Sequence, residues 1–170
     1  KTSANGWELW KTNGNEVGTN MVKDICPGVD SSFRGPYEPS VITEPIKFKA
    51  EMFVDANNVL YFAANDCTNG VELWRSNGEE SGTTMVKDIN TSGSSLSQFS
   101  RFLPVELNNT IYFSANDGVN GEELWKSDGI SSGTTMVKDI NLSGSSVPGS
   151  ITVFNNFLYF SVNDGDILGR

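Results

Sequence analysis

A stretch of sequence that occurs three times constrains this chain more than any other feature. It is written NGWELWKTNGNEVGTNMVKDIC from Asn5, NGVELWRSNGEESGTTMVKDIN from Asn69 and NGEELWKSDGISSGTTMVKDIN from Asn120. A second stretch recurs as NNVLYFAAND (57–66), NNTIYFSAND (108–117) and NNFLYFSVND (155–164). The tryptophans of the first stretch are 64 and then 51 residues apart. Periods of this size are typical of repeat architectures.

Each repeat predicts four strands. Strand A is MFVDA, FLPVEL or ITVF, and an Asn-Asn pair then forms a two-residue turn, because asparagine tolerates positive φ. Strand B is the VLYFAA stretch, strand C lies around ELW, and a longer hairpin loop leads to strand D, TMVKDI. The Lys and Asp of strand D suit an outer edge strand, since charges there discourage pairing with other chains.

A single four-stranded sheet cannot bury the tryptophan, phenylalanine and methionine of its own repeat. Stacking the repeats face to face buries them, so the fold class expected is all-β with propeller-type blades. A stacked solenoid and a sandwich stay open as alternatives. The side chains expected to pack between blades are Trp10, Trp74, Trp125, Phe62, Phe113 and Phe160.

The repeats divide the chain, residues 1–170, into one propeller-like domain with incomplete units at both ends. Residues 1–26 supply strands C and D of a first unit, 48–90 and 99–141 form complete units, and 150–170 supply strands A and B. Residues 27–47 form a proline-rich insertion. Known propellers have four to eight blades. The expectation is therefore a fragment of a longer repeat protein, or a chain that assembles head to tail with its copies.

Composition narrows the classes of function. The net charge is −9 and no basic patch is visible, so nucleic acid is not expected as a partner. No apolar segment is long enough to insert into a membrane. There is no histidine, which removes a Ser-His-Asp triad and the commonest general base. The four arginines occupy unrelated repeat positions, and no pair of carboxylates stands out from the repeat. The expectation is a protein that is not an enzyme.

The pattern ELWxxD/NG followed by GTxxVKDI resembles the ELWxxDGT-repeat family. That family occurs in large secreted and cell-surface proteins and its repeats are propeller-like. The resemblance covers most of the chain, with departures: only Asp128 keeps the aspartate of the motif, and Asn15, Glu79 and Ile130 stand where the family has threonine. The family carries no single established activity, so the resemblance implies fold and an extracellular or cell-surface location.

The two cysteines each depart from the repeat. Cys26 stands where the other copies have Asn90 and Asn141, and Cys67 where they have glycine. Two coordinated departures one unit apart predict a disulfide between the end of strand D and the B–C turn of the next unit, which would indicate an oxidising compartment. Two unrelated free thiols remain the alternative.

Three sequons, at Asn90, Asn108 and Asn141, lie in predicted turns, where N-glycosylation acceptors are found. They are candidate glycan sites if the chain passes through a eukaryotic secretory route; chance sequons in a Ser- and Asn-rich chain are the alternative.

The turn between strands B and C places carboxylate and amide oxygens close together. Ca²⁺ prefers such oxygens, so Asp66, Asp117 and Asp164 are the candidate calcium ligands, and no other cofactor is expected. The competing interpretation is that these residues cap their own turns by hydrogen bonds.

The insertion carries Phe33, Arg34 and Tyr37, which are candidate contacts for a partner because function often lies on loops of a rigid scaffold. A passive connection from one blade to the next is the alternative. The function expected is an extracellular structural or adhesive module that assembles with other protein chains, including copies of itself, at a cell surface or in a filament. The alternatives are a carbohydrate-binding propeller module and a fragment of a glycan-processing propeller enzyme.

Overall fold

The computed structural model describes residues 6–28, 32–33, 53–96 and 103–165, and within them the chain is all-β. The strands form two four-stranded antiparallel sheets and two hairpins. We call the hairpin of β1 (Leu9–Lys11) and β2 (Asn20–Lys23) unit 1. Unit 2 contains β3 (Phe53–Ala56), β4 (Val59–Asn65), β5 (Val71–Ser76) and β6 (Thr84–Lys87). Unit 3 contains β7 (Val105–Leu107), β8 (Thr110–Asn116), β9 (Glu122–Ser127), the short 3-10 turn η1 (Ser131–Gly133) and β10 (Thr135–Lys138). Unit 4 is the hairpin of β11 (Gly149–Phe154) and β12 (Phe157–Ser161).

The Asn-Asn turns fold as the sequence predicts. All six of these asparagines have positive φ, from 47° to 64°, at Asn57, Asn58, Asn108, Asn109, Asn155 and Asn156. Two consecutive residues of positive φ define the type I′ turn, whose twist matches that of the strands on either side. The same turn therefore fixes the register of the first hairpin in units 2, 3 and 4.

The strand register is the same in the two complete units. Phe62 faces Trp74 in unit 2, and Phe113 faces Trp125 in unit 3. Each tryptophan also faces the methionine of the following strand, and unit 1 repeats this with Trp10 opposite Met21. A slip of one residue would turn every side chain to the other face of its sheet, so the repeated register places equivalent residues in equivalent positions.

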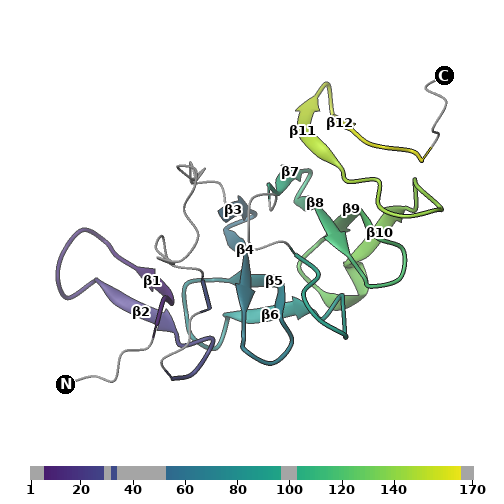
Figure 1. Ribbon diagram of the computed structural model, residues 1–170. Coiled ribbons are helices and arrows are strands. Elements are labelled where there is room, and N and C mark those ends of the chain that lie inside the picture. The colour runs from purple at the N-terminus through teal and green to yellow at the C-terminus, as the bar shows by residue number, and fades with distance from the viewer. Residues whose placement is uncertain (1–5, 29–31, 34–52, 97–102, 166–170) are drawn as a thin grey trace, which may run out of the picture.

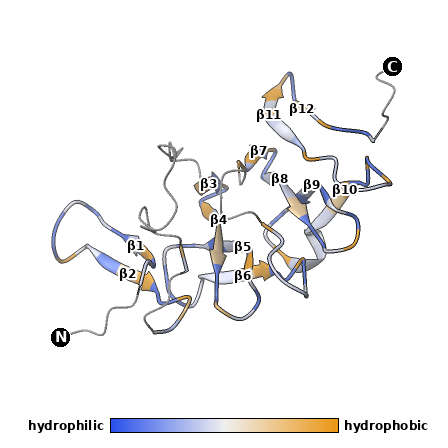
Figure 2. Cartoon of the chain, in the orientation of Figure 1, coloured by the Kyte–Doolittle hydropathy of each residue, from blue (hydrophilic) through white to orange (hydrophobic). Residues whose placement is uncertain are grey.

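The hydrophobic core lies between the units. Alternate residues of β4 enter two different clusters: Tyr61 and Ala63 pack with β8 and β9 of unit 3, whereas Phe62 and Ala64 pack with β1 and β2 of unit 1. Successive side chains of a strand point to opposite faces, so unit 2 is covered on both sides. Apolar residues accordingly concentrate on the strands, as Figure 2 shows.

The units follow one another along a curved row, with the two chain ends at its opposite ends (Figure 1). The first strands of consecutive units contact one another, β3 with β7 and β7 with β11. Within the described ranges no strand of unit 1 pairs with unit 4. The predicted four-stranded antiparallel units are therefore present, and the described residues do not close into a ring.

The predicted insertion 27–47 begins too early. Ser32 and Phe33 occupy the places that Ser95 and Leu96 take in the next unit: the Phe33 amide donates to the Trp7 carbonyl, as the Leu96 amide donates to Val71. The sequence comparison missed this because the connecting loop is one residue longer in unit 1. Residues 34–47 lie outside the described residues.

Candidate functional site: the contact between units

In each of units 1, 2 and 3 a glutamate of the ELW motif ties strand C to the loop that follows strand D, and in units 2 and 3 this glutamate is buried. The Glu72 carboxylate accepts hydrogen bonds from the Ile89 amide at 3.0 Å, the Ser95 amide at 2.9 Å and the Ser95 hydroxyl at 2.5 Å. Glu123 accepts the equivalent three from Ile140 and Ser146, and Glu8 from Ile25 and Ser32. The Ser95 and Ser146 amides also donate to the carbonyls of Val71 and Glu122, so the glutamate adds a second acceptor for these amides and is the acceptor for those of Ile89 and Ile140.

Burial raises the pKa of Glu72 above its usual range, and the negative charge of Asp88 raises it further against the hydrogen bonds from Ser95 and Ile89. Glu72 and Glu123 have no exposed surface. Reasoning from the sequence missed this role. The signal was present, because a glutamate directly precedes the Leu-Trp pair in all three ELW motifs.

Polar contacts between units also repeat. The Lys23 ammonium of unit 1 donates to the Thr83 carbonyl of unit 2 at 2.9 Å, and Lys87 of unit 2 donates to the Thr134 carbonyl of unit 3 at 2.9 Å. Lys87 also lies 5.8 Å from the centre of the Trp125 ring, within the range of a cation–π contact. The lysine of MVKDI, which the sequence assigned to edge protection, therefore joins one unit to the next.

The aromatic residues predicted to pack between blades are buried in units 2 and 3 and at least partly exposed in units 1 and 4. Trp74 and Trp125 are each 6% exposed, and Phe62 and Phe113 have no exposed surface. Trp10 is 59% exposed and Phe160 is partly exposed. Among the described residues no unit precedes unit 1 and unit 4 has no strand C. Trp10 therefore lacks the neighbouring unit that covers Trp74, and Phe160 lacks the facing tryptophan that covers Phe62.

The predicted disulfide is present between Cys26 and Cys67, with Cα atoms 5.4 Å apart. It joins the end of β2 in unit 1 to the turn after β4 in unit 2. The other units use an asparagine against a glycine at this position: a Cβ on Gly118 would lie 2.8 Å from the Asn90 side-chain oxygen. Cys67 adopts a φ of 64°, close to the 81° of Gly118. The disulfide therefore replaces a contact that the fold already makes.

We expect the double substitution Cys26→Asn with Cys67→Gly to lower the free energy of unfolding by about 2–4 kcal/mol. The variant recreates the Asn–Gly pair of the other units, so it removes the covalent bond with little change of backbone. Denaturant unfolding measures the loss, and hydrogen exchange should locate it in β1 and β2. An unchanged unfolding midpoint, or equal loss of protection in unit 3, would contradict the expectation.

The aspartates predicted as calcium ligands cap their own turns. Asp66 accepts from the Thr68 amide at 2.9 Å, the Asn69 amide at 2.7 Å and the Asn69 side chain at 2.7 Å, and Asp117 repeats this with Val119 and Asn120. Burial alone would raise the pKa of each, but these hydrogen bonds outweigh it and lower both pKa values below the usual range. No group of three or more metal-ligating residues occurs in the part of the chain that the structure describes, where Asp164 also lies.

The three sequon asparagines differ in accessibility. Asn141 is 8% exposed, and its side-chain nitrogen donates to the Ser145 carbonyl at 3.0 Å. Asn90 makes the same bond to Ser94 at 3.2 Å. Asn108 is exposed on its turn, with its side chain donating to Asn156 at 3.1 Å. A glycan on Asn141 would require its amide to leave a buried hydrogen bond, whereas the Asn108 turn faces solvent.

Of the three predicted partner contacts, the structure describes only Phe33. Phe33 packs on Phe53 and Phe62, with ring centres 5.9 and 5.7 Å away. This contact belongs to the core of units 1 and 2, so Phe33 is not the exposed residue that the sequence suggested. Arg34 and Tyr37 lie outside the described residues.

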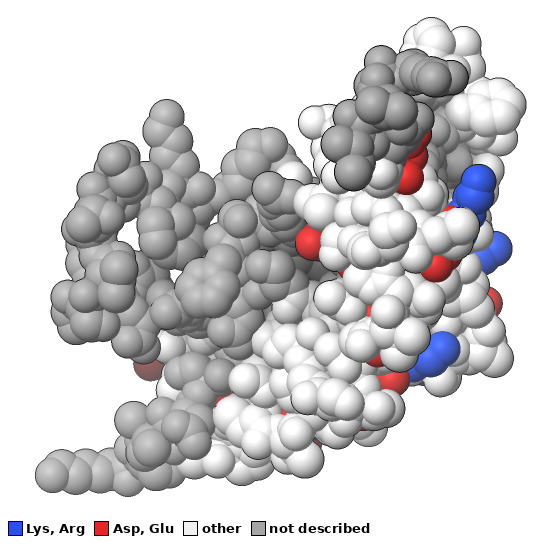
Figure 3. Space-filling view, turned by 45° about the vertical axis from the view of Figure 1, so that its right-hand side comes forward, with Lys and Arg blue, Asp and Glu red and all other residues white. Residues whose placement is uncertain are grey.

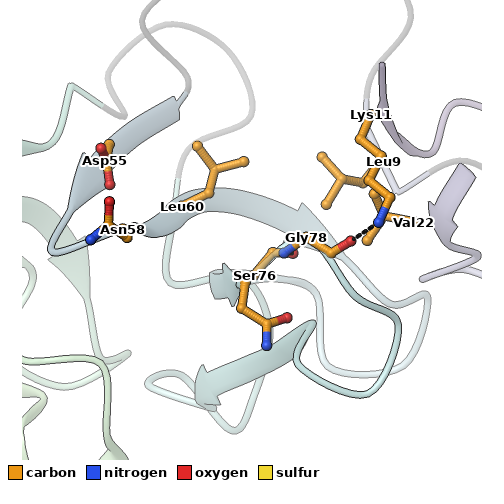
Figure 4. Close-up of a pocket in the computed structure, with 9 residues that line it drawn as sticks. Leu9, Lys11, Val22, Asp55, Asn58, Leu60, Ser76 and Gly78 are labelled. Atoms are coloured by element: carbon orange, nitrogen blue, oxygen red, sulfur yellow. Dashed lines mark hydrogen bonds between the residues drawn. The ribbon is translucent and has the colours of Figure 1, made fainter. Parts of the chain in front are cut away.

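A cleft of about 430 Å³ opens where units 1 and 2 meet. Leu9, Lys11 and Val22 line it from unit 1, and residues of β3–β5 and the loop after β5 line it from unit 2. Figure 4 shows the Lys11 ammonium crossing between the units to the Gly78 carbonyl, a distance of 2.7 Å. Lys11 also forms an ion pair with Glu79.

Charges on the surface are scattered. In Figure 3, Lys and Arg lie along the right-hand edge, and acidic residues are spread among uncharged ones. In the described residues we find no helix with the length and apolar character needed to cross a bilayer.

Comparison of the chain with protein-family models, with curated proteins and with solved structures finds no match.

Proposed function

We propose that this chain is a non-enzymatic, extracellular structural and adhesive module, built of propeller-type units, that assembles with other protein chains through the faces by which its own units pack. The contact between units has the most extensive set of specific interactions in the described residues. It combines buried tryptophan, a lysine that crosses to the next unit and, in one case, a disulfide. A disulfide suits an oxidising compartment, which supports an extracellular or cell-surface location.

The exposure of three equivalent valines is the main observation that supports this proposal. Val22 and Val86 of strand D are each 7% exposed because the next unit covers them, whereas the equivalent Val137 is 46% exposed. Unit 4 follows unit 3 but contributes only strands A and B among the described residues, so strand D of unit 3 keeps the residues of an interface without strands C and D of a neighbour across it. Exposed apolar surface rimmed by polar residues marks a protein contact in a soluble protein. Contact between β3, β7 and β11 at one side of the row supports radial packing of the units.

Adding a unit tests this function. A chain that runs to Asp164 and continues with a copy of residues 118–148 supplies strands C and D to unit 4. We expect its free energy of unfolding to rise by about 2 kcal/mol or more, because stability in repeat proteins comes from contacts between neighbours. The control carries the same added residues in scrambled order. No gain over the scrambled control would overturn the proposal.

The alternatives predict a different result. A carbohydrate-binding module, or a piece of a glycan-processing enzyme, should bind a class of sugars on a glycan array, and calcium-dependent binding should be lost in EDTA. Asp66 and Asp117 already have their carboxylate oxygens in hydrogen bonds of the turn, which favours the structural function.

A further inference from the structure

We propose that β12 of one molecule adds to the free edge of β1 in a second copy of this chain, with Tyr159 seated in the cleft between units 1 and 2. This inference rests on the proposed function and names its partner. Within the complete units, β4 pairs with β3 on one edge and β5 on the other, and β8 is likewise paired on both edges. Among the described residues, β12 pairs only with β11, and β1 only with β2.

The two free edges belong to complementary halves of one unit. β11 and β12 are strands A and B, and β1 and β2 are strands C and D. Each half makes a hydrogen bond to its neighbouring unit that the corresponding strands of a complete unit also make. The Asn163 amide donates to the Ser146 carbonyl at 2.8 Å, as the Asn116 amide donates to Ser95 inside the chain. Lys23 anchors unit 1 to unit 2 in the way that Lys87 anchors unit 2 to unit 3. Strand addition would therefore require little rearrangement of either half.

The cleft between units 1 and 2 lies at the position where, between units 2 and 3, a tyrosine side chain packs against a glycine. Between units 2 and 3, Tyr61 of strand B is 4% exposed and sits against Gly129, so that a Cβ added to Gly129 would collide with the tyrosine hydroxyl. The equivalent glycine between units 1 and 2 is Gly78, and nothing lies within 4 Å of a Cβ added there. Gly78 lines the cleft of Figure 4. Unit 1 has no described strand B, so no tyrosine of its own fills this place.

Tyr159 is the residue that fits. It occupies the position of Tyr61 in the NNxxYF repeat and is 53% exposed. Phe154 and Phe157 of the same hairpin are also exposed. The β4–β5 and β8–β9 registers transfer directly and place Tyr159 opposite Lys11, Phe160 opposite Trp10, and Leu158 opposite Thr12. The exposed aromatic residues at the two ends of the chain would then cover each other.

The geometry also sets the assembly. Each copy offers one β12 edge and one β1 edge, so the contact joins copies head to tail. Two copies that close on each other contain four complete units and two composite ones, a total of six. Six lies within the four to eight blades of known propellers.

Cross-linking in a defined register tests the proposal. A Thr12→Cys chain mixed with a Leu158→Cys chain should form a disulfide-linked dimer under mild oxidation, because the native cysteines are already paired. The control mixture uses Thr12→Cys with Ser161→Cys, which places the thiol on the other face of the strand and leaves Tyr159 in place. Cross-linking only in the first mixture supports the proposal; cross-linking in neither, or equally in both, overturns it.

A second measurement uses the tyrosine itself. Sedimentation equilibrium of the unmodified chain should show masses at multiples of the monomer. Tyr159→Ser should weaken association by about tenfold or more, as expected for a buried aromatic anchor. The exposed Val119→Ser, outside both edges, should change it by less than about twofold. A monomeric chain, or undiminished association of Tyr159→Ser, overturns the inference. If the unit-addition experiment still succeeds, the proposed function stands without this partner.

Discussion

Replacing Glu72 with alanine is expected to lower the free energy of unfolding by about 3–5 kcal/mol. This loss is expected even though the substitution replaces a buried acidic side chain with an apolar one. Glu72 is fully buried and accepts three hydrogen bonds from Ile89 and Ser95. Alanine leaves the Ile89 amide and the Ser95 hydroxyl without the acceptor they have in the folded protein, at a cost of about 1–3 kcal/mol each, whereas the Ser95 amide keeps the Val71 carbonyl. Denaturant unfolding followed by tryptophan fluorescence measures the change.

Two further variants serve as controls for this prediction. Glu8→Ala removes the same three hydrogen bonds from a half-buried site in unit 1 and should cost less. Glu72→Gln keeps the shape of the side chain and one acceptor oxygen. Its loss of unfolding free energy should therefore fall between the losses of Glu8→Ala and Glu72→Ala. Equal losses for Glu8→Ala and Glu72→Ala would show that burial does not set the strength of the contact.

The charge of Glu72 gives this contact a pH dependence. Burial raises its pKa above the usual value, so the folded state binds a proton more tightly than the unfolded state does. The stability contributed by this proton is complete below the usual carboxyl pKa and is lost as the pH rises through the raised one. Glu72→Gln lacks this titration, so the unfolding free energies of the two proteins should diverge across that window and run parallel above it. Parallel curves throughout would contradict the raised pKa.

Replacing Trp125 with alanine is expected to cost about 3–5 kcal/mol, whereas the same change at Trp10 should cost less than about 1 kcal/mol. The two tryptophans share one motif and one register, and differ in exposure, 6% against 59%. Trp125 fills the core between units 2 and 3, so its removal leaves a cavity, while Trp10 leaves only a surface dent. Chemical unfolding at protein concentrations below self-association measures both.

The pair also separates two explanations of the repeated tryptophan. If packing between units selects it, the two losses differ as stated. If the residue stabilises its own hairpin instead, for example by facing Met136 in one and Met21 in the other, the losses should be alike. Equal losses would remove the argument that unit 1 presents an open face.

The sequence by itself determined the local structure. The NN pairs determine the type I′ turns, because few residues other than asparagine and glycine accept positive φ at two consecutive positions. Period-two patterning and the repeated spacing then determine four strands per unit and the register between them. The two departures from the repeat at Cys26 and Cys67 identified the disulfide. These features depend on neighbours in the chain, or on a comparison between copies, and a single sequence contains both.

Only the tertiary structure decided which repeated residues act within a unit and which act between units. The sequence did not single out Glu72, which the structure places under the Ser95 loop, and it offered Phe33 as a partner contact, which the structure packs on Phe62. Trp10 and Trp125 are indistinguishable by motif, yet one is exposed and the other is buried. The physical reason is that burial and hydrogen bonding depend on which unit lies across the interface, and the identical motif has a neighbour in one place and none in the other.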